Sequence, residues 1–163
     1  MNIGIASDHR GYRLKQKLLK YLKHVGYDTK DLGTNSKSPV DYPDMAFLLA
    51  DQVVNQDVDF GIAICGSGIG ISIACNKVKG IRCAKVDSIS EAKLARLDND
   101  ANILALNGTM PTYKAKDIVD AFLKTDFSHI ERHQNRIDKI SQYENKKRSG
   151  RKKIEKEDSG DER

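Results

Sequence analysis

Short apolar runs alternate with amphipathic stretches along most of this chain. The apolar runs predict strands: residues 60–64 form the clearest buried one, and the more polar residues 27–32 indicate one nearer a sheet edge. The predicted strands cover residues 3–6, 27–32, 60–64, 82–86 and 102–106.

The amphipathic stretches predict helices. In residues 12–24, Leu14, Leu18 and Leu22 recur at helical spacing while lysines occupy other positions. The predicted helices cover residues 12–24, 43–55, 68–77, 90–97, 111–124 and 131–143. Regular alternation of strands and helices is typical of a parallel sheet with both faces covered. We therefore expect an α/β fold, a Rossmann-like three-layer sandwich with a central parallel sheet of about five strands.

Composition divides the 163 residues into one domain, residues 1–143, and a charged tail, residues 144–163. The tail holds eight basic and six acidic residues but a single aliphatic one, Ile154. So few apolar groups cannot offset the entropy of ordering, so we expect a disordered tail or a frayed helix end. The body is nearly balanced in charge, and no aromatic residue interleaves the basic run of the tail. A nucleic-acid partner is therefore disfavoured.

The remaining composition points to a cytoplasmic protein. No apolar run is long enough to span a membrane, and the N-terminus has no signal-peptide pattern. The three cysteines form no CxxC pair, which argues against a disulfide framework and against a structural zinc site.

A glycine-rich turn, residues 64–70, follows the clearest buried strand. Glycines in such a turn let backbone N–H groups converge into an anion-binding nest, and the following helix start adds partial positive charge. Cys65 sits beside this nest, where a thiolate would serve as a nucleophile or a proton acceptor. The turn taken alone is equally consistent with a tight strand-to-helix connection that buries a cysteine. It matches neither the GxGxxG dinucleotide pattern nor a Walker motif.

A second polar cluster, residues 7–11, follows the first strand and includes Asp8 and His9. Ligands of such sheets bind beyond the carboxyl ends of the strands, where both clusters fall. An acid, a histidine and a cation, Arg10, at this strand end suit a hydroxylated, phosphorylated ligand. Asp8 alone is somewhat better explained as a cap of the next helix.

Together the clusters resemble the type B ribose-5-phosphate isomerases and the related galactose-6-phosphate isomerase subunits. The resemblance spans about residues 1 to 143. The matching segments are residues 6–11, 40–44, 64–70, 74–82, 99–102 and 132–136. It implies a metal-free, cofactor-free aldose–ketose isomerisation of a sugar phosphate, in a homodimer or tetramer whose subunits share each active site.

The resemblance also implies residue roles. Cys65 resembles the base that moves the proton, Ser67 stands where many relatives have threonine, and Asp8 resembles a ring-opening or hydroxyl-binding group. The anion hole for the enediolate would comprise Gly66, Ser67, Gly68, Ile69 and Gly70. The phosphate ligands would be His9, Arg132 and Arg136, with a neighbouring chain as one source of the two arginines. Asn99 would bind a sugar hydroxyl, and Tyr42 would stand in the pocket wall.

Two positions depart from the family pattern. Asp98 replaces the usual ring-opening histidine, and a carboxylate that is ionised at pH 7 is a poor acid unless it is buried. Thr109 stands where relatives carry an arginine. These changes are consistent with a pentose-phosphate isomerase in which Asp98, Asp8 or water opens the ring. They are also consistent with an isomerase of a hexose 6-phosphate, such as galactose or allose 6-phosphate, or with a non-catalytic sugar-phosphate-binding subunit.

Overall fold

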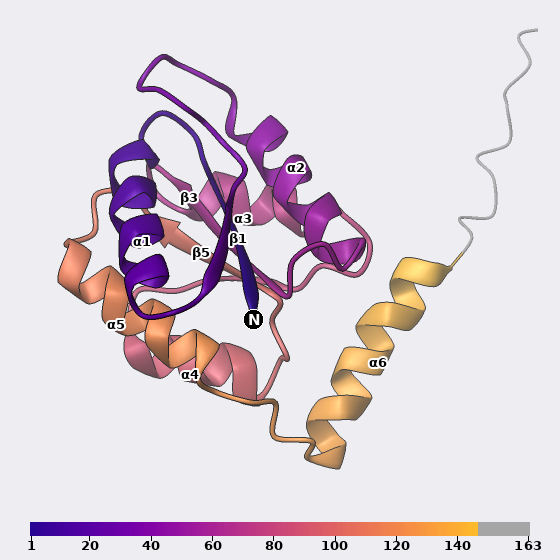
Figure 1. Cartoon of the computed structure of the whole chain (residues 1–163). Helices are drawn as coiled ribbons and strands as arrows, with labels where there is room; N and C mark the ends of the chain where they lie inside the picture. Colours follow the sequence, from indigo (N-terminus) through magenta and orange to yellow (C-terminus); the bar gives the residue numbers. More distant parts are fainter. Residues whose placement is uncertain (147–163) are drawn as a thin grey trace, which may run out of the picture.

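The computed structural model describes residues 1–146 and confirms the predicted α/β fold. Its strands form one fully parallel sheet in the order β2-β1-β3-β5-β4 (Figure 1). They are β1 (Asn2–Ser7), β2 (Asp28–Asp31), β3 (Phe60–Cys65), β4 (Cys83–Lys85) and β5 (Ile103–Asn107). The polar strand β2 lies at an edge of the sheet, as its composition predicted.

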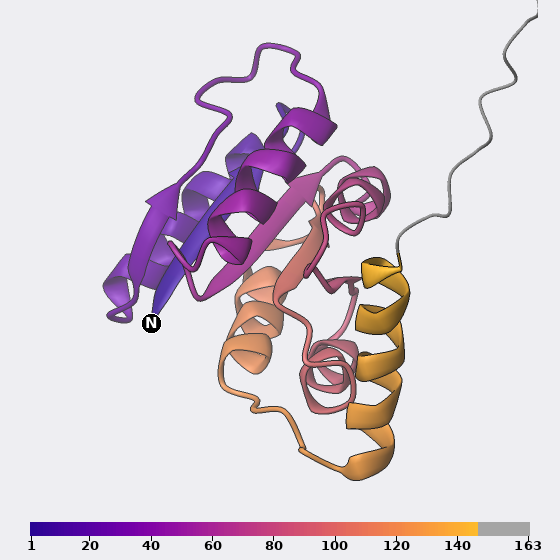
Figure 2. The same cartoon turned by 90° about the vertical axis from the view of Figure 1, so that its right-hand side faces the viewer.

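Helices cover both faces of this sheet, in the three layers that Figure 2 shows from the side. They are α1 (Tyr12–His24), α2 (Tyr42–Val54), α3 (Ile69–Cys75), α4 (Ile89–Leu97), α5 (Thr112–Leu123) and α6 (Glu131–Asn145). Two separate hydrophobic cores lie on the two faces of the sheet. Residues of α1, α4 and α5 pack into one core, and residues of α2 and α3 pack into the other.

The two faces of the sheet differ in side-chain size because successive strand residues point to opposite sides. Ile62 and Ile64 enter the core beneath α1, α4 and α5, whereas Ala63 and Cys65 face α2 and α3. On that second face α2 approaches so closely that a Cβ added to Gly61 would lie 3.1 Å from the Leu49 side chain. Small residues thus bring α2 and α3 close to the strand that ends at Cys65.

The last helix, α6, lies at the side of the sandwich and is attached at few points. Only His133 and Ile137 among its described residues are buried. Near its C-terminus, Glu144 accepts a hydrogen bond of 3.2 Å from the backbone N–H of Gly80. The helix thus includes the first two residues of the expected tail, Glu144 and Asn145, and the tail from residue 147 onward lies outside the described residues.

Neither a membrane span nor a metal-binding cluster appears in the described part of the chain. Within residues 1–146, no helix is long and apolar enough to cross a bilayer. The same residues contain no group of three or more histidine, cysteine or acidic side chains able to hold a metal ion.

Candidate active site

The centre of the candidate site is Cys65, the last residue of β3. The chain turns through Gly66, Ser67 and Gly68 and enters α3 at Ile69. The backbone N–H of Gly68 points at the Cys65 sulfur, with an N–Sγ distance of 3.2 Å. A backbone N–H aimed at sulfur suits a sulfur that carries negative charge.

Gly68 is needed for the shape of this turn. Its φ is +76°, a left-handed conformation that favours glycine, and an added Cβ would lie 2.9 Å from the Leu106 carbonyl carbon. Ser67 is exposed, and its hydroxyl oxygen accepts a hydrogen bond of 3.1 Å from the Ile69 N–H. The turn therefore presents an exposed hydroxyl next to a buried thiol.

The end of β1 lies beside this turn. The N–H of Asp8 donates to the carbonyl of Ile64, at 3.1 Å. One carboxylate oxygen of Asp8 accepts hydrogen bonds from the backbone N–H groups of Arg10 and Gly11, at 2.9 and 3.0 Å. These hydrogen bonds close the turn before α1, whose N-cap is Gly11 and which has no side-chain capping hydrogen bond, so the capping expected of Asp8 is not found. They hold the Asp8 carboxylate next to the strand that bears Cys65.

Two more predicted residues join this group. His9 is partly exposed and accepts a hydrogen bond through Nδ1 from the Val40 N–H, at 3.2 Å. Tyr42, at the start of α2, lays its ring against Gly70: a Cβ added to Gly70 would lie 2.7 Å from the ring carbon that bears the hydroxyl. Tyr42 thus borders the glycine turn.

Arg10, the cation of the predicted second polar cluster, also belongs to this group. Its guanidinium lies against Gly66, where an added Cβ would be 2.6 Å from the central carbon of the guanidinium. Its place in residues 7–11, two positions after Asp8 at a strand end, predicted a cation here but not its contact with Gly66.

The remaining predicted residues form a second group, between α4 and α6. Asp98 follows the last turn of α4, and its carboxylate lies 3.4 Å from Nε2 of His133 on α6. Arg132 and Arg136 are exposed on the same helix. His133 itself is buried against Asp98.

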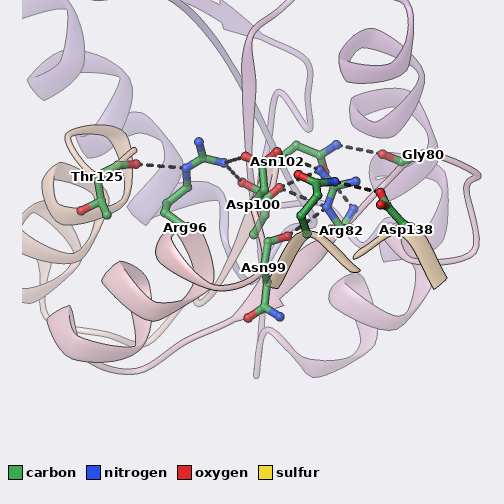
Figure 3. Close-up of polar contacts among 10 residues, drawn as sticks. Gly80, Arg82, Arg96, Asn99, Asp100, Asn102, Thr125 and Asp138 are labelled. Carbon is green, nitrogen blue, oxygen red and sulfur yellow. Dashed lines mark hydrogen bonds and ion pairs between the residues drawn. The ribbon is translucent and has the colours of Figure 1, made fainter. Parts of the chain in front are cut away.

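The loop that carries Asn99 is held by two arginines (Figure 3). Arg82 donates to the carbonyl oxygens of Asn99 and Asp100, at 3.0 and 2.8 Å, and Arg96 donates to the Asp100 carboxylate at 2.8 Å. Figure 3 shows the Asn99 side chain directed away from this cluster. The backbone is therefore fixed, while the amide of Asn99 is presented outward.

The structure does not bring the two groups together within one chain. Cys65 pairs with Asn107 at the end of β5, whereas Gly61 pairs with Ile103 at its start. Four residues of strand correspond to about 13 Å at roughly 3.3 Å per residue. Asp98 and Asn99 come before β5 in the chain, so they lie at the opposite end of the sheet from Cys65. Measured along the strands, they are more than this distance away from Cys65.

The other cysteines differ from Cys65. Cys75 is fully buried on α3, and its thiol points at the Ala46 carbonyl, with a sulfur–oxygen distance of 3.9 Å. A hydrogen bond with Cys75, together with burial, raises the pKa of Cys83 well above its ordinary value. Such a thiol holds little thiolate near neutral pH, which leaves Cys65 as the better candidate for a base.

Comparisons with known proteins agree with this geometry. A family model of ribose/galactose isomerases matches residues 3–140. A solved structure of ribose-5-phosphate isomerase B from Clostridium thermocellum superposes with a TM-score of 0.86 and is 47% identical, covering 88% of this chain and 97% of its own. The Mycoplasma genitalium enzyme of that name, crystallised with bound ribulose-5-phosphate, gives a TM-score of 0.84 at 47% identity, covering 90% of this chain and 97% of its own.

A ribose-5-phosphate isomerase B of Mycobacterium tuberculosis is 40% identical over 146 residues, which are 88% of this chain and 90% of that protein. Fold and family model together define an isomerase of sugar phosphates. The chain belongs to the ribose/galactose isomerase family, and the resemblance found in its sequence motifs is confirmed.

Proposed function

We propose that this protein interconverts ribose 5-phosphate and ribulose 5-phosphate through an enediolate, with Cys65 as the base. The observation that carries the proposal is the Cys65 sulfur facing the Gly68 N–H in the turn after β3. The bound ribulose-5-phosphate of the Mycoplasma genitalium relative supports this choice of substrate.

The reaction needs a proton acceptor and a stabilised oxyanion. The Cys65 thiolate takes the proton from C2 of the open-chain aldose, the electron pair forms the C1–C2 double bond, and O1 becomes anionic. The same sulfur then returns the proton to C1, while the Ser67 hydroxyl moves a proton between the two oxygens. All electrons stay in the sugar, so the reaction requires no redox cofactor.

The anion hole and the ligands follow from the positions of the other residues. Backbone N–H groups of the turn from Gly66 to Gly70 would hold the enediolate oxygen. Asp8 and Asp98 would open the sugar ring and Tyr42 would wall the pocket. The phosphate and hydroxyl ligands in this proposal are His9, Arg132, Arg136 and Asn99.

The active site is proposed to be shared between two chains of a homodimer. Its residues fall at opposite ends of one sheet, so a complete site needs the second group from a partner. An apolar surface next to the Cys65 turn supports such an assembly. Its members on α2 and α3 are Phe47, Leu48, Val54, Ile69 and Ile73, each more than 40% exposed. Large exposed apolar patches of this kind mark interaction sites.

A cytoplasmic location is proposed with this function. The three cysteines are all free thiols in the described structure, which suits a reducing compartment.

The base assignment is tested by Cys65→Ala. Removing a general base lowers turnover by about 10²- to 10⁴-fold, and we expect a loss of kcat/KM in that range with both pentose phosphates. Cys75→Ala is the matched control, because that thiol lies in the same layer and points at a carbonyl. Near-full turnover by Cys65→Ala would remove the proposed base.

Substrate size is tested separately, because the replacement of a histidine by Asp98 favours a hexose 6-phosphate as the second candidate. We expect a higher kcat/KM for ribose 5-phosphate than for allose or galactose 6-phosphate, and the reverse order would transfer the activity to six-carbon sugars. Saturable binding without deuterium exchange at the sugar C2 proton would instead identify a non-catalytic subunit.

A further inference from the structure

Arg10 places a positive charge at the glycine turn, and this charge has no assigned role. Its backbone N–H is held by the Asp8 carboxylate at 2.9 Å, which fixes where the side chain starts. From there the guanidinium reaches Gly66: an added Cβ would lie 2.6 Å from Cζ and Nη1 and 2.8 Å from Nε. Gly66 follows Cys65 directly. Because Gly66 has no side chain, the guanidinium can lie this close to its backbone.

Among residues 1–146, no carboxylate neutralises this guanidinium. Within residues 1–146, Arg10 makes no ion pair, and its side chain donates no hydrogen bond. Asp8, the nearest acid along the chain, directs one oxygen to the backbone N–H groups of Arg10 and Gly11. A guanidinium beside converging backbone donors, without an acidic partner, is an arrangement that attracts an anionic ligand.

The neighbouring loop adds no charge of its own. The N–H of Gly108 donates to the Cys65 carbonyl at 2.8 Å, and a Cβ added to Gly108 would lie 2.7 Å from the Arg10 carbonyl oxygen. Thr109, the next residue, is exposed and donates its hydroxyl to Asn107 at 2.7 Å. The loops that bear Arg10, Cys65 and Thr109 therefore converge at one place, and Arg10 supplies the cation.

We propose that Arg10 binds the enediolate oxygen and stabilises the negative charge that forms during proton transfer. This inference rests on the proposed function. The guanidinium lies against Gly66, the residue directly after the base, and the reacting carbons of a bound sugar would have to reach this turn to meet the sulfur. The phosphate is carried at the other end of the sugar, on C5. Arg10 therefore stabilises the transition state more than the bound substrate, which is the condition for an effect on kcat.

The test replaces Arg10 with Met, which keeps side-chain length and removes the charge, and with Lys, which keeps the charge. Loss of one oxyanion donor lowers kcat by about 10²-fold or more, so Arg10→Met is expected to lose kcat on that scale with little change in KM. Arg10→Lys should retain most of the activity. Arg10 is exposed, so both variants are expected to keep the melting temperature of the native chain.

Two inhibitors separate the enediolate from the phosphate. A phosphorylated hydroxamate that mimics the enediolate should bind about 100-fold more weakly to Arg10→Met, in line with the kcat loss, whereas the inhibition constant of inorganic phosphate should not change. A raised KM with weakened phosphate inhibition and unchanged kcat would overturn the proposal and assign Arg10 to the phosphate. Equal losses of kcat in the Lys and Met variants would also overturn the proposal, because the positive charge of Arg10 would then not account for the loss.

Failure of this inference differs from failure of the proposed function. An unmodified chain that does not isomerise either pentose phosphate refutes the function itself. An active chain whose Arg10→Met variant keeps its kcat refutes only the role of Arg10.

Discussion

Single glycines determine the shape of the turn that follows β3. Gly66 admits the Arg10 guanidinium, Gly70 admits the Tyr42 ring, and Gly68 turns the chain toward α3. At Gly66 and Gly70 the facing group is a side chain that can move, whereas at Gly68 it is the backbone of Leu106. Gly68 is therefore the least replaceable of the three.

Gly68→Ala should destabilise the protein and abolish activity. A non-glycine residue in the left-handed region costs about 1–2 kcal/mol, and the clash with β5 adds to that, so we expect a loss of more than about 2 kcal/mol in urea denaturation. Gly26→Ala is the control: its φ is also positive, at +96°, but nothing lies within 4 Å of its Cβ position. Equal losses in the two variants would show that the clash does not matter.

At the scale of elements, α1 and α5 are joined by one hydrogen bond between distant residues. The Tyr21 hydroxyl on α1 donates to the Asp120 carboxylate on α5, at 2.8 Å. This bond, with burial, raises the pKa of Tyr21 to about 12 from its ordinary 10.0. The folded state therefore favours the neutral phenol.

Tyr21→Phe should cost about 1 kcal/mol at neutral pH. Because the folded pKa is raised, the stabilisation is fully present below pH 10 and is lost as the pH rises from 10.0 toward about 12. Urea denaturation of both chains at pH 7 and pH 11 should show the difference shrinking at the higher pH. Tyr113→Phe, at a 72% exposed position, should have no effect at either pH. A difference that grows with pH would contradict the direction of the pKa change.

The elements themselves could be predicted from sequence because their causes are local. The leucine spacing that predicted residues 12–24 matches the bounds of α1, and the polar character of residues 27–32 predicted the edge position of β2. Contacts between distant residues leave no such pattern. Arg10 meets Gly66, and Asp98 meets His133, only because the sheet and α6 bring separate segments together. The resemblance supplied Asp98 as a site residue, but not its buried partner.

At the scale of the whole molecule, one chain contains two incomplete parts of the proposed site. The part around Cys65 lies at the carboxyl ends of β1 and β3, and the part around Asp98 and Arg136 lies near the start of β5 and on α6. In a two-fold symmetric dimer, each contact made by one chain is made again by the other. Two complete sites would then form, each with one part from each chain.

This arrangement predicts that two inactive variants restore activity when mixed. Cys65→Ala and Arg136→Ala damage different parts, so a mixed dimer holds one site with both defects and one intact site. Random exchange makes about half the dimers mixed, so about a quarter of native activity should return after joint unfolding and refolding. Refolding each variant alone is the control. If each site lay within one chain, the mixture would stay as inactive as its components, and the proposed sharing of sites would be wrong.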